Sequence, residues 1–164
     1  MAFQLLVLRH GKSIRGPEFA TDFERPLALR GIKAAGRIGR LVRDLDLVPE
    51  LIVTSPAVRA LTTAKLVRKE LGEVALVKDE RIYSGYGEEL VSLIQSLPTD
   101  RSKVMIVGHN PGFEDLVDEL TGKDDTILKT CSLAILLGHS ESWSMCVREG
   151  FQLTEVFHPR ELPK

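Results

Sequence analysis

Two arginines and two histidines stand where apolar segments of the sequence give way to polar ones. An arginine guanidinium can hold phosphate oxygens with paired N–H groups, and a neutral imidazole can attack phosphorus or transfer protons. The stretch LVLRHGKS places the first arginine and histidine next to each other after an apolar run. These residue types therefore indicate chemistry on a phosphate-bearing substrate. The four residues are Arg9, His10, Arg59 and His109.

One alternative for the first of these segments is a nucleotide-binding P-loop, since Gly11-Lys12-Ser13 matches the end of that motif. The motif also requires a glycine five residues before its last glycine. Leu6 occupies that position, so too few residues remain to wrap a triphosphate. The P-loop interpretation fails on its own spacing, and the Arg-His pair remains the feature to explain.

The elements that must hold these residues alternate between short apolar runs and amphipathic segments. Predicted strands cover residues 3–8, 51–54, 74–77, 103–108, 132–137 and 143–147. Predicted helices cover residues 29–45, a segment from Ser55-Pro56 to Gly72, residues 88–97, and a segment from Asn110-Pro111 to Gly122. Ser55 and Asn110 would be the N-caps of helices whose first turn holds a proline. The last two strands would form a hairpin across GHSES.

Strands separated by single helices favour a mostly parallel sheet that is covered on both faces. We therefore predict an α/β fold, a three-layer α/β/α sandwich in which the final hairpin supplies an antiparallel edge. The chain has 164 residues, of which 43% are apolar and 27% charged, and it shows no internal repeat or linker. This length fits one domain spanning residues 1–164.

Several features indicate a protein of the cytoplasm. No apolar run approaches the roughly 20 residues of a membrane span. The first residues, MAFQLLVL, lack the basic leader and the cleavage site of a signal peptide. Cys131 and Cys146 do not have the spacing of a metal site, and we expect two buried core thiols. We therefore predict no membrane partner and a reducing, cytoplasmic environment.

Charge is distributed unevenly, although the net charge is −1. Residues 1–70 carry 13 Lys and Arg against 7 Asp and Glu, whereas residues 71–164 carry 9 against 16. The basic excess fits either a solvated helix face, as on the predicted helix 29–45, or a local demand for positive charge in a phosphate pocket. No basic block is interleaved with aromatic residues, so we expect no nucleic-acid partner.

The sheet determines where these residues meet, because ligands of open α/β sheets bind outside the carboxyl ends of the strands. Arg9, His10 and His109 follow strand ends, Arg59 lies one helical turn beyond another, and Asn110 stands beside His109. Each residue alone has an ordinary explanation in a loop, a cap or a surface, but together they favour an anion site. Two flanking arginines and the lack of a carboxylate or thiolate cluster oppose a metal ion.

Three segments resemble the signature segments of the histidine phosphatase superfamily, also called the phosphoglycerate mutase-like family. They are LRHGKS, TSPAVRALTTA and VGHNPG, and they occur in the family's order and at its separations. ERPLALRG (24–31) further resembles the RPLTxxG segment of the small SixA-like phosphohistidine phosphatases, with Ala28 and Leu29 where that branch often has a threonine and a polar residue. The resemblance implies a phosphoglycerate mutase-like fold. It also implies a single histidine phosphatase domain.

The resemblance implies that His10 is the nucleophile and that Arg9 and Arg59 hold the phosphate oxygens. His109 would complete the pocket. General chemistry agrees, because nearby arginines favour a neutral imidazole, which can attack phosphorus in line. Positive side chains stabilise the charge on the transferred group, so neither a metal ion nor another cofactor is required. Water would then hydrolyse the phosphohistidine intermediate.

The proton donor for the leaving group is less clearly marked. Larger members of the superfamily carry an acidic residue after the third strand region, where this chain has Glu88 and Glu89. Two glutamates at a helix start also suit the helix dipole without any catalytic role. Without an acid, substrates with a good leaving group are favoured, such as the nitrogen of phosphohistidine. Arg25 either lines the substrate entrance or is simply exposed in its loop.

Three functional hypotheses follow. The first is a metal-independent, monomeric phosphatase that acts on a phosphohistidine-bearing protein. The second is a phosphomonoesterase that uses the same site on a small phosphorylated substrate. The third is a phosphoprotein-binding module without turnover. The complete set of two arginines and two histidines argues against the third, since binding alone does not need a nucleophile.

Overall fold

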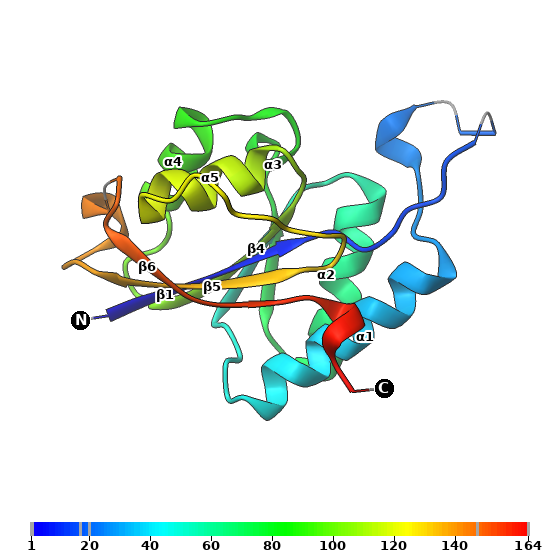
Figure 1. The fold of residues 1–164 in the computed structure, drawn as a ribbon, viewed down its shortest axis with the longest axis horizontal. Helices are drawn as coiled ribbons and strands as arrows, with labels where there is room; N and C mark the ends of the chain where they lie inside the picture. Colours follow the sequence, from blue (N-terminus) through cyan, green and yellow to red (C-terminus); the bar gives the residue numbers. More distant parts are fainter. Residues whose placement is uncertain (1, 17, 20, 147, 164) are drawn as a thin grey trace.

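The computed structural model describes residues 2–16, 18–19, 21–146 and 148–163, which form one sheet between two layers of helices (Figure 1). The strands are β1 (Ala2–Arg9), β2 (Leu51–Thr54), β3 (Ala75–Lys78), β4 (Lys103–Gly108), β5 (Leu133–His139) and β6 (Phe151–Phe157). The α-helices are α1 (Leu29–Asp44), α2 (Val58–Leu71), α3 (Arg81–Ser84), α4 (Glu88–Gln95) and α5 (Gly112–Thr121). Short 3₁₀ helices are η1 (Asp22–Glu24), η2 (Trp143–Met145) and η3 (Pro159–Glu161).

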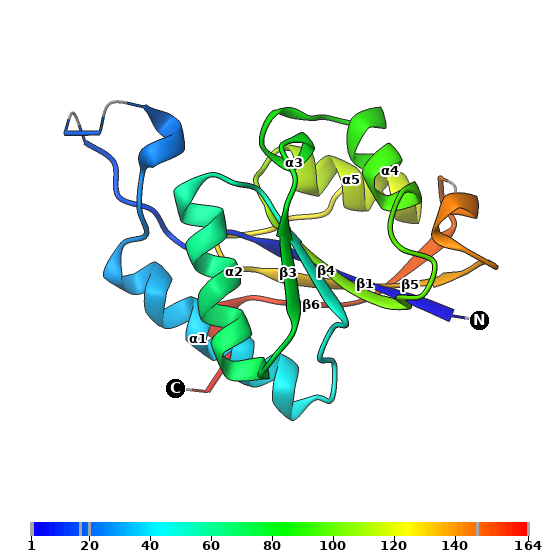
Figure 2. The same ribbon diagram turned by 180° about the vertical axis from the view of Figure 1, so that it is seen from behind.

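The strands lie in the order β3-β2-β4-β1-β5-β6. The first four in this order are parallel to one another, β5 is antiparallel to β1, and β6 is antiparallel to β5. Helices α1 and α2 cover one face of the sheet, and α3, α4 and α5 cover the other, as Figure 2 shows from behind. The predicted three-layer fold, with a mostly parallel sheet and an antiparallel edge, is confirmed.

Strand β1 illustrates how the sequence builds both layers of the core. Leu5 and Val7 pack with the layer of α4 and α5, whereas Leu6 and Leu8 pack with the layer of α1 and α2. All four side chains are fully buried, which stabilises the fold by about 1.5–3 kcal/mol each. Because β1 also lies between β4 and β5 in the sheet, its carboxyl end is a rigid base for the residues that follow.

The predicted strand at 143–147 is wrong over the residues that the structure describes, and residue 147 lies outside them. Trp143 begins η2 instead, and β6 is the strand that pairs with β5. The indole of Trp143 is fully buried against Phe3 and donates its Nε1–H to the carbonyl oxygen of Arg101. A buried tryptophan needs both an apolar site and a hydrogen-bond acceptor. This segment therefore packs into the core on the face of α4 and α5 and does not pair with β5.

The predicted N-caps are also wrong, because the two helices begin later than expected and neither Ser55 nor Asn110 caps them. The hydroxyl of Ser55 accepts the backbone N–H of Ala57 at 3.2 Å and closes a turn before α2. The amide of Asn110 donates to the carbonyl oxygen of Leu128 at 2.7 Å. The bond of Ser55 is a local alternative to capping, whereas Asn110 is drawn to a carbonyl 18 residues further along the chain.

The other predicted strands and helices lie within a few residues of the observed ones, whereas the short helix α3 was not predicted. Cys131 and Cys146 are both free and buried, as expected. In the described part of the chain, no helix is both long enough and apolar enough to cross a membrane.

Candidate active site

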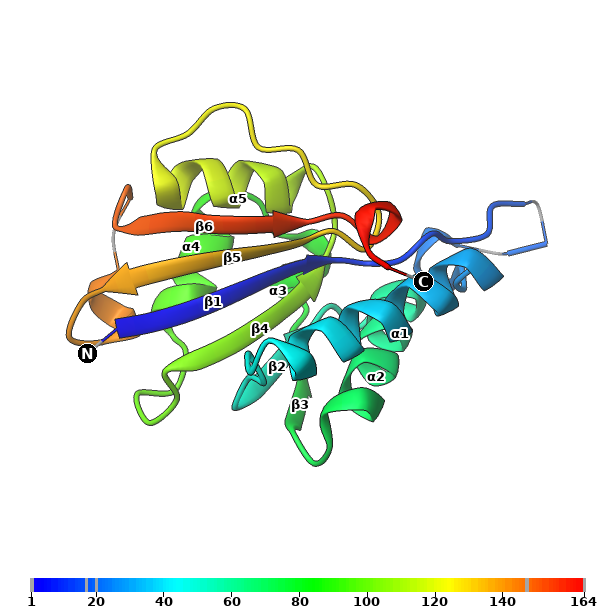
Figure 3. The same ribbon diagram turned by 60° about the horizontal axis from the view of Figure 1, so that its bottom comes forward.

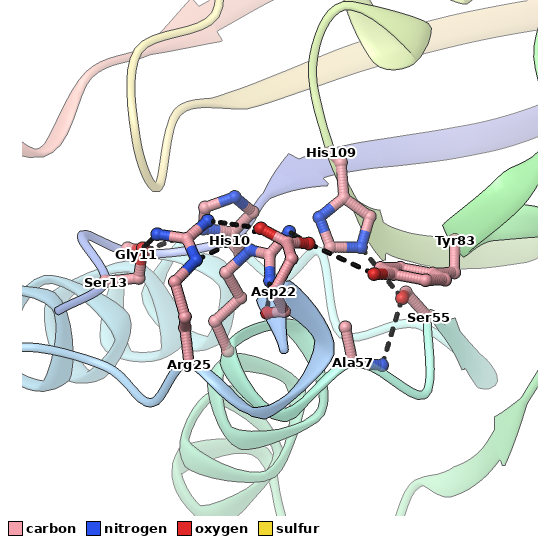
Figure 4. A network of polar contacts seen from close by, with 10 residues as sticks. His10, Gly11, Ser13, Asp22, Arg25, Ser55, Ala57, Tyr83 and His109 are labelled. Carbon is pink, nitrogen blue, oxygen red and sulfur yellow. Dashed lines mark hydrogen bonds and ion pairs between the residues drawn. The ribbon is translucent and has the colours of Figure 1, made fainter. Parts of the chain in front are cut away.

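The register of β1 and β4 brings the two predicted histidines together. Arg9 lies opposite Gly108 in the parallel ladder, and the next residues, His10 and His109, leave the sheet side by side. The backbone N–H of His10 donates to the carbonyl oxygen of Gly108 at 2.9 Å. The two imidazole rings have centroids 5.2 Å apart, and Figure 4 shows them at the strand ends.

The ring of His10 is held in one tautomer. His10 is 8% exposed, and its Nδ1 lies 2.7 Å from the carbonyl oxygen of Gly11. A carbonyl oxygen can only accept, so Nδ1 carries the proton of the neutral ring and Nε2 keeps its lone pair. Burial is the main cause that lowers the pKa of His10 to about 3; the bond to Gly11 acts in the opposite direction, and the neighbouring charges of Arg59 and Arg9 lower the pKa further. The imidazole is therefore neutral at physiological pH, as a nucleophile must be.

The ring of His109 is bonded through its other nitrogen. Its Nε2 lies 2.8 Å from the hydroxyl oxygen of Ser55, which also accepts the backbone N–H of Ala57. A hydroxyl both donates and accepts, so this contact is compatible with either tautomer of the neutral ring. The remaining ring nitrogen, Nδ1, is buried and has no hydrogen-bond partner among the described residues. Burial, followed by the charge of Arg59, lowers the pKa of His109 to about 4, so the ring is neutral at physiological pH.

Arg59 extends from the first turn of α2 and is only 6% exposed. Its Nη1 donates to the backbone carbonyl of Asp22 at 2.8 Å, and its Nη2 donates to Oδ2 of the same residue at 2.9 Å. The Nε–H of Arg59 is buried and has no partner in the described structure. The guanidinium therefore keeps a donor for a further acceptor while its charge is balanced by a carboxylate.

Asp22 is a site residue that the sequence pattern did not indicate. Its side chain is 54% exposed and also accepts hydrogen bonds from Arg25 and from the hydroxyl of Tyr83, both at 3.1 Å (Figure 4). Burial alone would raise the pKa of Asp22, but the hydrogen bond and charge of Arg59, with the two further bonds, lower it to about 2. An ionised carboxylate thus ties these three side chains together beside the histidines.

The RPLALRG segment supports the loop that follows His10. Backbone hydrogen bonds join residues 12–14 to residues 26–28, among them the N–H of Ala28 to the carbonyl oxygen of Lys12 at 2.8 Å. A Cβ atom at position 31 would lie 2.3 Å from that same carbonyl oxygen. Gly31 is therefore required where α1 passes against the loop.

Arg9 and Asn110 converge on one acceptor. Arg9 Nη1 donates to the carbonyl oxygen of Leu128 at 2.9 Å, and the Asn110 amide donates to the same oxygen. Arg9 Nε and Asn110 Oδ1 are buried and lack partners among the described residues. Arg25 is not simply exposed, because it donates to the hydroxyl of Ser13 at 2.9 Å as well as to Asp22. The structure thus brings these predicted binding residues to the strand ends.

Glu88 and Glu89 stand apart from this cluster. Both are exposed at the start of α4, where they occupy the first helical turn. Glu88 lines a pocket with Gln95 and Glu119, and the Glu89 carboxylate lies beside Gly85. Among the described residues, no hydrogen bond links either glutamate to the two histidines, and their role as a proton donor stays a prediction.

Comparison with known proteins identifies the family to which the chain belongs. The histidine phosphatase superfamily (branch 1) matches residues 5–84 of the chain. An uncharacterized chloroplastic protein of Arabidopsis thaliana is 30% identical over 150 residues, which cover 85% of this chain and 68% of that protein. The chain belongs to the histidine phosphatase superfamily. It is a phosphatase, and the predicted membership of this superfamily is confirmed, with the first two of the three signature segments inside the matched residues.

Solved structures place this histidine phosphatase near the SixA branch. A candidate phosphohistidine phosphatase SixA from Agrobacterium tumefaciens is 26% identical, with a TM-score of 0.81 over 96% of this chain and 98% of that one. The protein histidine phosphatase SixA in complex with tungstate is 21% identical and has a TM-score of 0.83 over 98% and 100% of the two chains. The second likeness concerns the fold alone. The predicted phosphoglycerate mutase-like fold and SixA-like branch are confirmed.

Proposed function

We propose that this histidine phosphatase hydrolyses phosphohistidine in a protein, with His10 as the nucleophile. The observation that carries the proposal is the state of His10, whose Nδ1–H is held by the Gly11 carbonyl while Nε2 keeps its lone pair at neutral pH. In the same cluster, Arg59 Nε and His109 Nδ1 are buried and have no hydrogen-bond partner among the described residues. The likeness to a candidate SixA of 26% identity supports the substrate class.

In the first step, Nε2 of His10 attacks phosphorus while the P–N bond to the substrate imidazole breaks. The electron pair of that bond stays on the leaving nitrogen, which takes up a proton from solvent. The bond from Nδ1–H to the carbonyl oxygen of Gly11 stabilises the positive charge that develops on the His10 ring. Arg9, Arg59 and His109 donate to the phosphoryl oxygens and stabilise their charge.

In the second step, water attacks phosphorus in line and the P–N bond to His10 breaks. The electron pair returns to Nε2, and inorganic phosphate leaves with one proton of the water while the other proton passes to solvent, which replaces the proton taken up in the first step. Asp22, with a pKa of about 2, is ionised and does not supply a proton for the leaving group, so it acts as a positioning residue for Arg59. Because the carboxyl group beside Arg59 is ionised, the nitrogen leaving group of phosphohistidine is favoured over an alkoxide, which needs a proton more strongly.

No group of three or more His, Cys, Asp or Glu side chains within the described ranges is placed to hold a metal ion. The proposed steps use side chains of this chain alone. The monomeric state, the cytoplasmic location, the lack of a nucleic-acid or membrane partner and the single domain spanning residues 1–164 stay predictions.

A specific observation favours the second candidate, a phosphomonoesterase for small substrates. A pocket of about 360 Å³ lies against Asp22 and Arg25 and is also lined by Arg15, Phe19 and Thr21. Its volume is within the range of about 300–1,000 Å³ that is usual for small-molecule sites. The body of a small phosphate ester could occupy this pocket while its phosphate lies on Arg59. A module without turnover is the least favoured candidate, since it would not need a neutral nucleophile.

The experiment measures phosphate release from a protein phosphorylated on histidine, with a chelator present. We expect release by the parent, a loss of at least about a thousandfold in His10→Ala, and full activity in His139→Ala, an exposed histidine at the end of β5. Release that persists in His10→Ala would contradict the proposed nucleophile. Release only from a small alkyl phosphate would establish the second candidate, and binding of the phosphoprotein without release from any substrate would establish the third.

A further inference from the structure

A second basic site lies beside the catalytic cluster, in a cavity of about 420 Å³. Its walls come from α1, from the loop that precedes β5 and from η3, which Figure 3 shows lying next to α1. Cationic side chains from all of these segments and from the end of β1 line the cavity. They are Arg9, Lys12, Arg30, Arg37, Lys129 and Arg160. The proposed reaction uses only the first of them.

Five of the six cationic side chains in this cavity have no carboxylate partner among the described residues, whereas Arg9 feels the charge of Glu114. None of its lining residues is acidic. Within the described residues, Lys12, Arg30, Arg37, Lys129 and Arg160 make no ion pair with a carboxylate. Elsewhere on the same helix the pattern differs, because other arginines of α1 pair with Glu70 or Asp44. Gathering unpaired cations costs free energy through mutual repulsion, and a bound anion would remove that cost.

The shape of the cavity follows from the sequence of α1. Arg30, Ala34 and Arg37 lie four and three residues apart and therefore share one face of the helix. The small side chain of Ala34, between two long cationic ones, leaves a hollow, and Pro159 lies on the opposite wall. His158 also lines the cavity, with its Nδ1 fixed 2.6 Å from the hydroxyl oxygen of Ser132. Cationic side chains thus surround the apolar side chains of Ala34 and Pro159.

We propose that this cavity binds a small molecule that carries two or more linked phosphate groups. The five cations extend from α1, from η3 and from two loops, so a chain of phosphates, which is longer than a single phosphate, presents acceptors to more of them at once. The volume lies within the range of about 300–1,000 Å³ for small-molecule sites. Two classes of ligand carry linked phosphate groups, namely nucleoside di- or triphosphates and inorganic polyphosphates. The experiment below distinguishes between them.

Isothermal titration calorimetry on the full chain tests the site, with ADP, ATP and inorganic tripolyphosphate as probes. The variant Arg30→Ser/Arg160→Ser removes two exposed cations of the cavity. The matched control, Lys33→Ser/Arg43→Ser, removes the same charge from exposed positions of α1 outside it. We expect at least tenfold weaker binding in the first variant and less than threefold in the control. Thermal unfolding of both variants verifies that they are folded.

Arg59→Ala separates this site from the catalytic cluster, because it should leave binding of the probes within threefold of the parent. Equal affinity for tripolyphosphate and ATP would assign the site to the phosphate chain alone, and tighter binding of ADP and ATP would assign it to nucleotides. No binding of any probe would overturn the proposal. Loss of binding in Arg59→Ala, or equal loss in the control variant, would overturn it too. The readout is binding alone, so it does not depend on the proposed reaction.

Discussion

The two sides of the active site are built in different ways. His10 and His109 leave neighbouring strands of a buried sheet, and backbone register determines how they meet. Asp22 and Arg25 lie on the connection between β1 and α1, where ion pairs and side-chain hydrogen bonds hold them. Burial sets the pKa of both histidines, whereas contacts with arginine overcome burial at Asp22. The strand side thus supplies fixed, neutral imidazoles, and the loop side controls the charge that an entering phosphate meets.

Arg59 joins the two sides, and among the residues that surround the two histidines its removal should have the largest effect. Arg59→Ala is expected to lower kcat/KM for a phosphohistidine substrate by about 100- to 1,000-fold, because it removes a donor that stabilises transferred charge. Arg68→Ala, further along the same helix, is the matched control and should change kcat/KM by less than about twofold. Steady-state kinetics of both variants measure the effect, and a loss below tenfold in Arg59→Ala would contradict this role.

The contact between α1 and the loop after β1 can be broken without touching a charged group. Gly31→Ala places a Cβ against the Lys12 backbone and should lower the free energy of unfolding by about 1–3 kcal/mol. Gly36→Ala, in the same helix, meets only the mobile guanidinium of Arg40 and should raise it by about 0.5–1 kcal/mol. Urea unfolding gives both values. Shifts of the same sign would show that the close approach at position 31 does not matter.

The carboxylate of Asp22 competes with an entering phosphate for Arg59, so the loop side should control phosphate affinity. Asp22→Asn should tighten the binding of inorganic phosphate by roughly 3- to 10-fold, and high salt should reduce the difference because the carboxylate is half exposed. Glu24→Gln, in the same 3₁₀ helix, is the control for the loss of one negative charge. Product inhibition by phosphate measures the change. Weaker inhibition in Asp22→Asn would contradict competition between the carboxylate and phosphate for Arg59.

The pH profile should show the smallest change. With the pKa of His10 near 3, its ring stays neutral and kcat/KM should vary by less than about twofold between pH 5 and 7. An acid limb near pH 6.5 would instead indicate an ordinary, exposed histidine. The stability of the protein should depend on His10 and His109 as well. In the unfolded chain their imidazoles take up protons below about pH 6.5, whereas in the folded protein both remain neutral. The free energy of unfolding should therefore fall as the pH drops from about 6.5 towards 4.

The strand side of the site could be predicted from sequence because local pattern determines it. A buried apolar run ends at Arg9, and the residues after parallel strands meet at one edge of the sheet. The role of His10 as a nucleophile came from the resemblance of three short segments rather than from periodicity. The local pattern did not predict the tautomer of His10, because that tautomer depends on the hydrogen bond to the Gly11 carbonyl.

The loop side could be predicted only at Arg25, because the contacts of Asp22 join distant parts of the chain. Asp22 meets Arg59 and Tyr83, 37 and 61 residues further along. Its sequence neighbours give no sign of either contact. The false strand at Trp143 has the same origin, since the acceptor for its indole is 42 residues away. Short-range spacing therefore predicts elements and strand ends, but not side chains that are positioned by distant partners.

Trapping the phosphorylated enzyme tests the role of His10 most directly. The parent protein is mixed with a phosphohistidine-bearing protein, quenched in base within its first turnover and analysed by peptide mass spectrometry. We predict one phosphoryl group on His10, stable in base and lost in acid, and none in His10→Ala. A phosphoryl group on another residue, or turnover of the substrate with no phosphorylated enzyme at any quench time, would contradict His10 as the nucleophile.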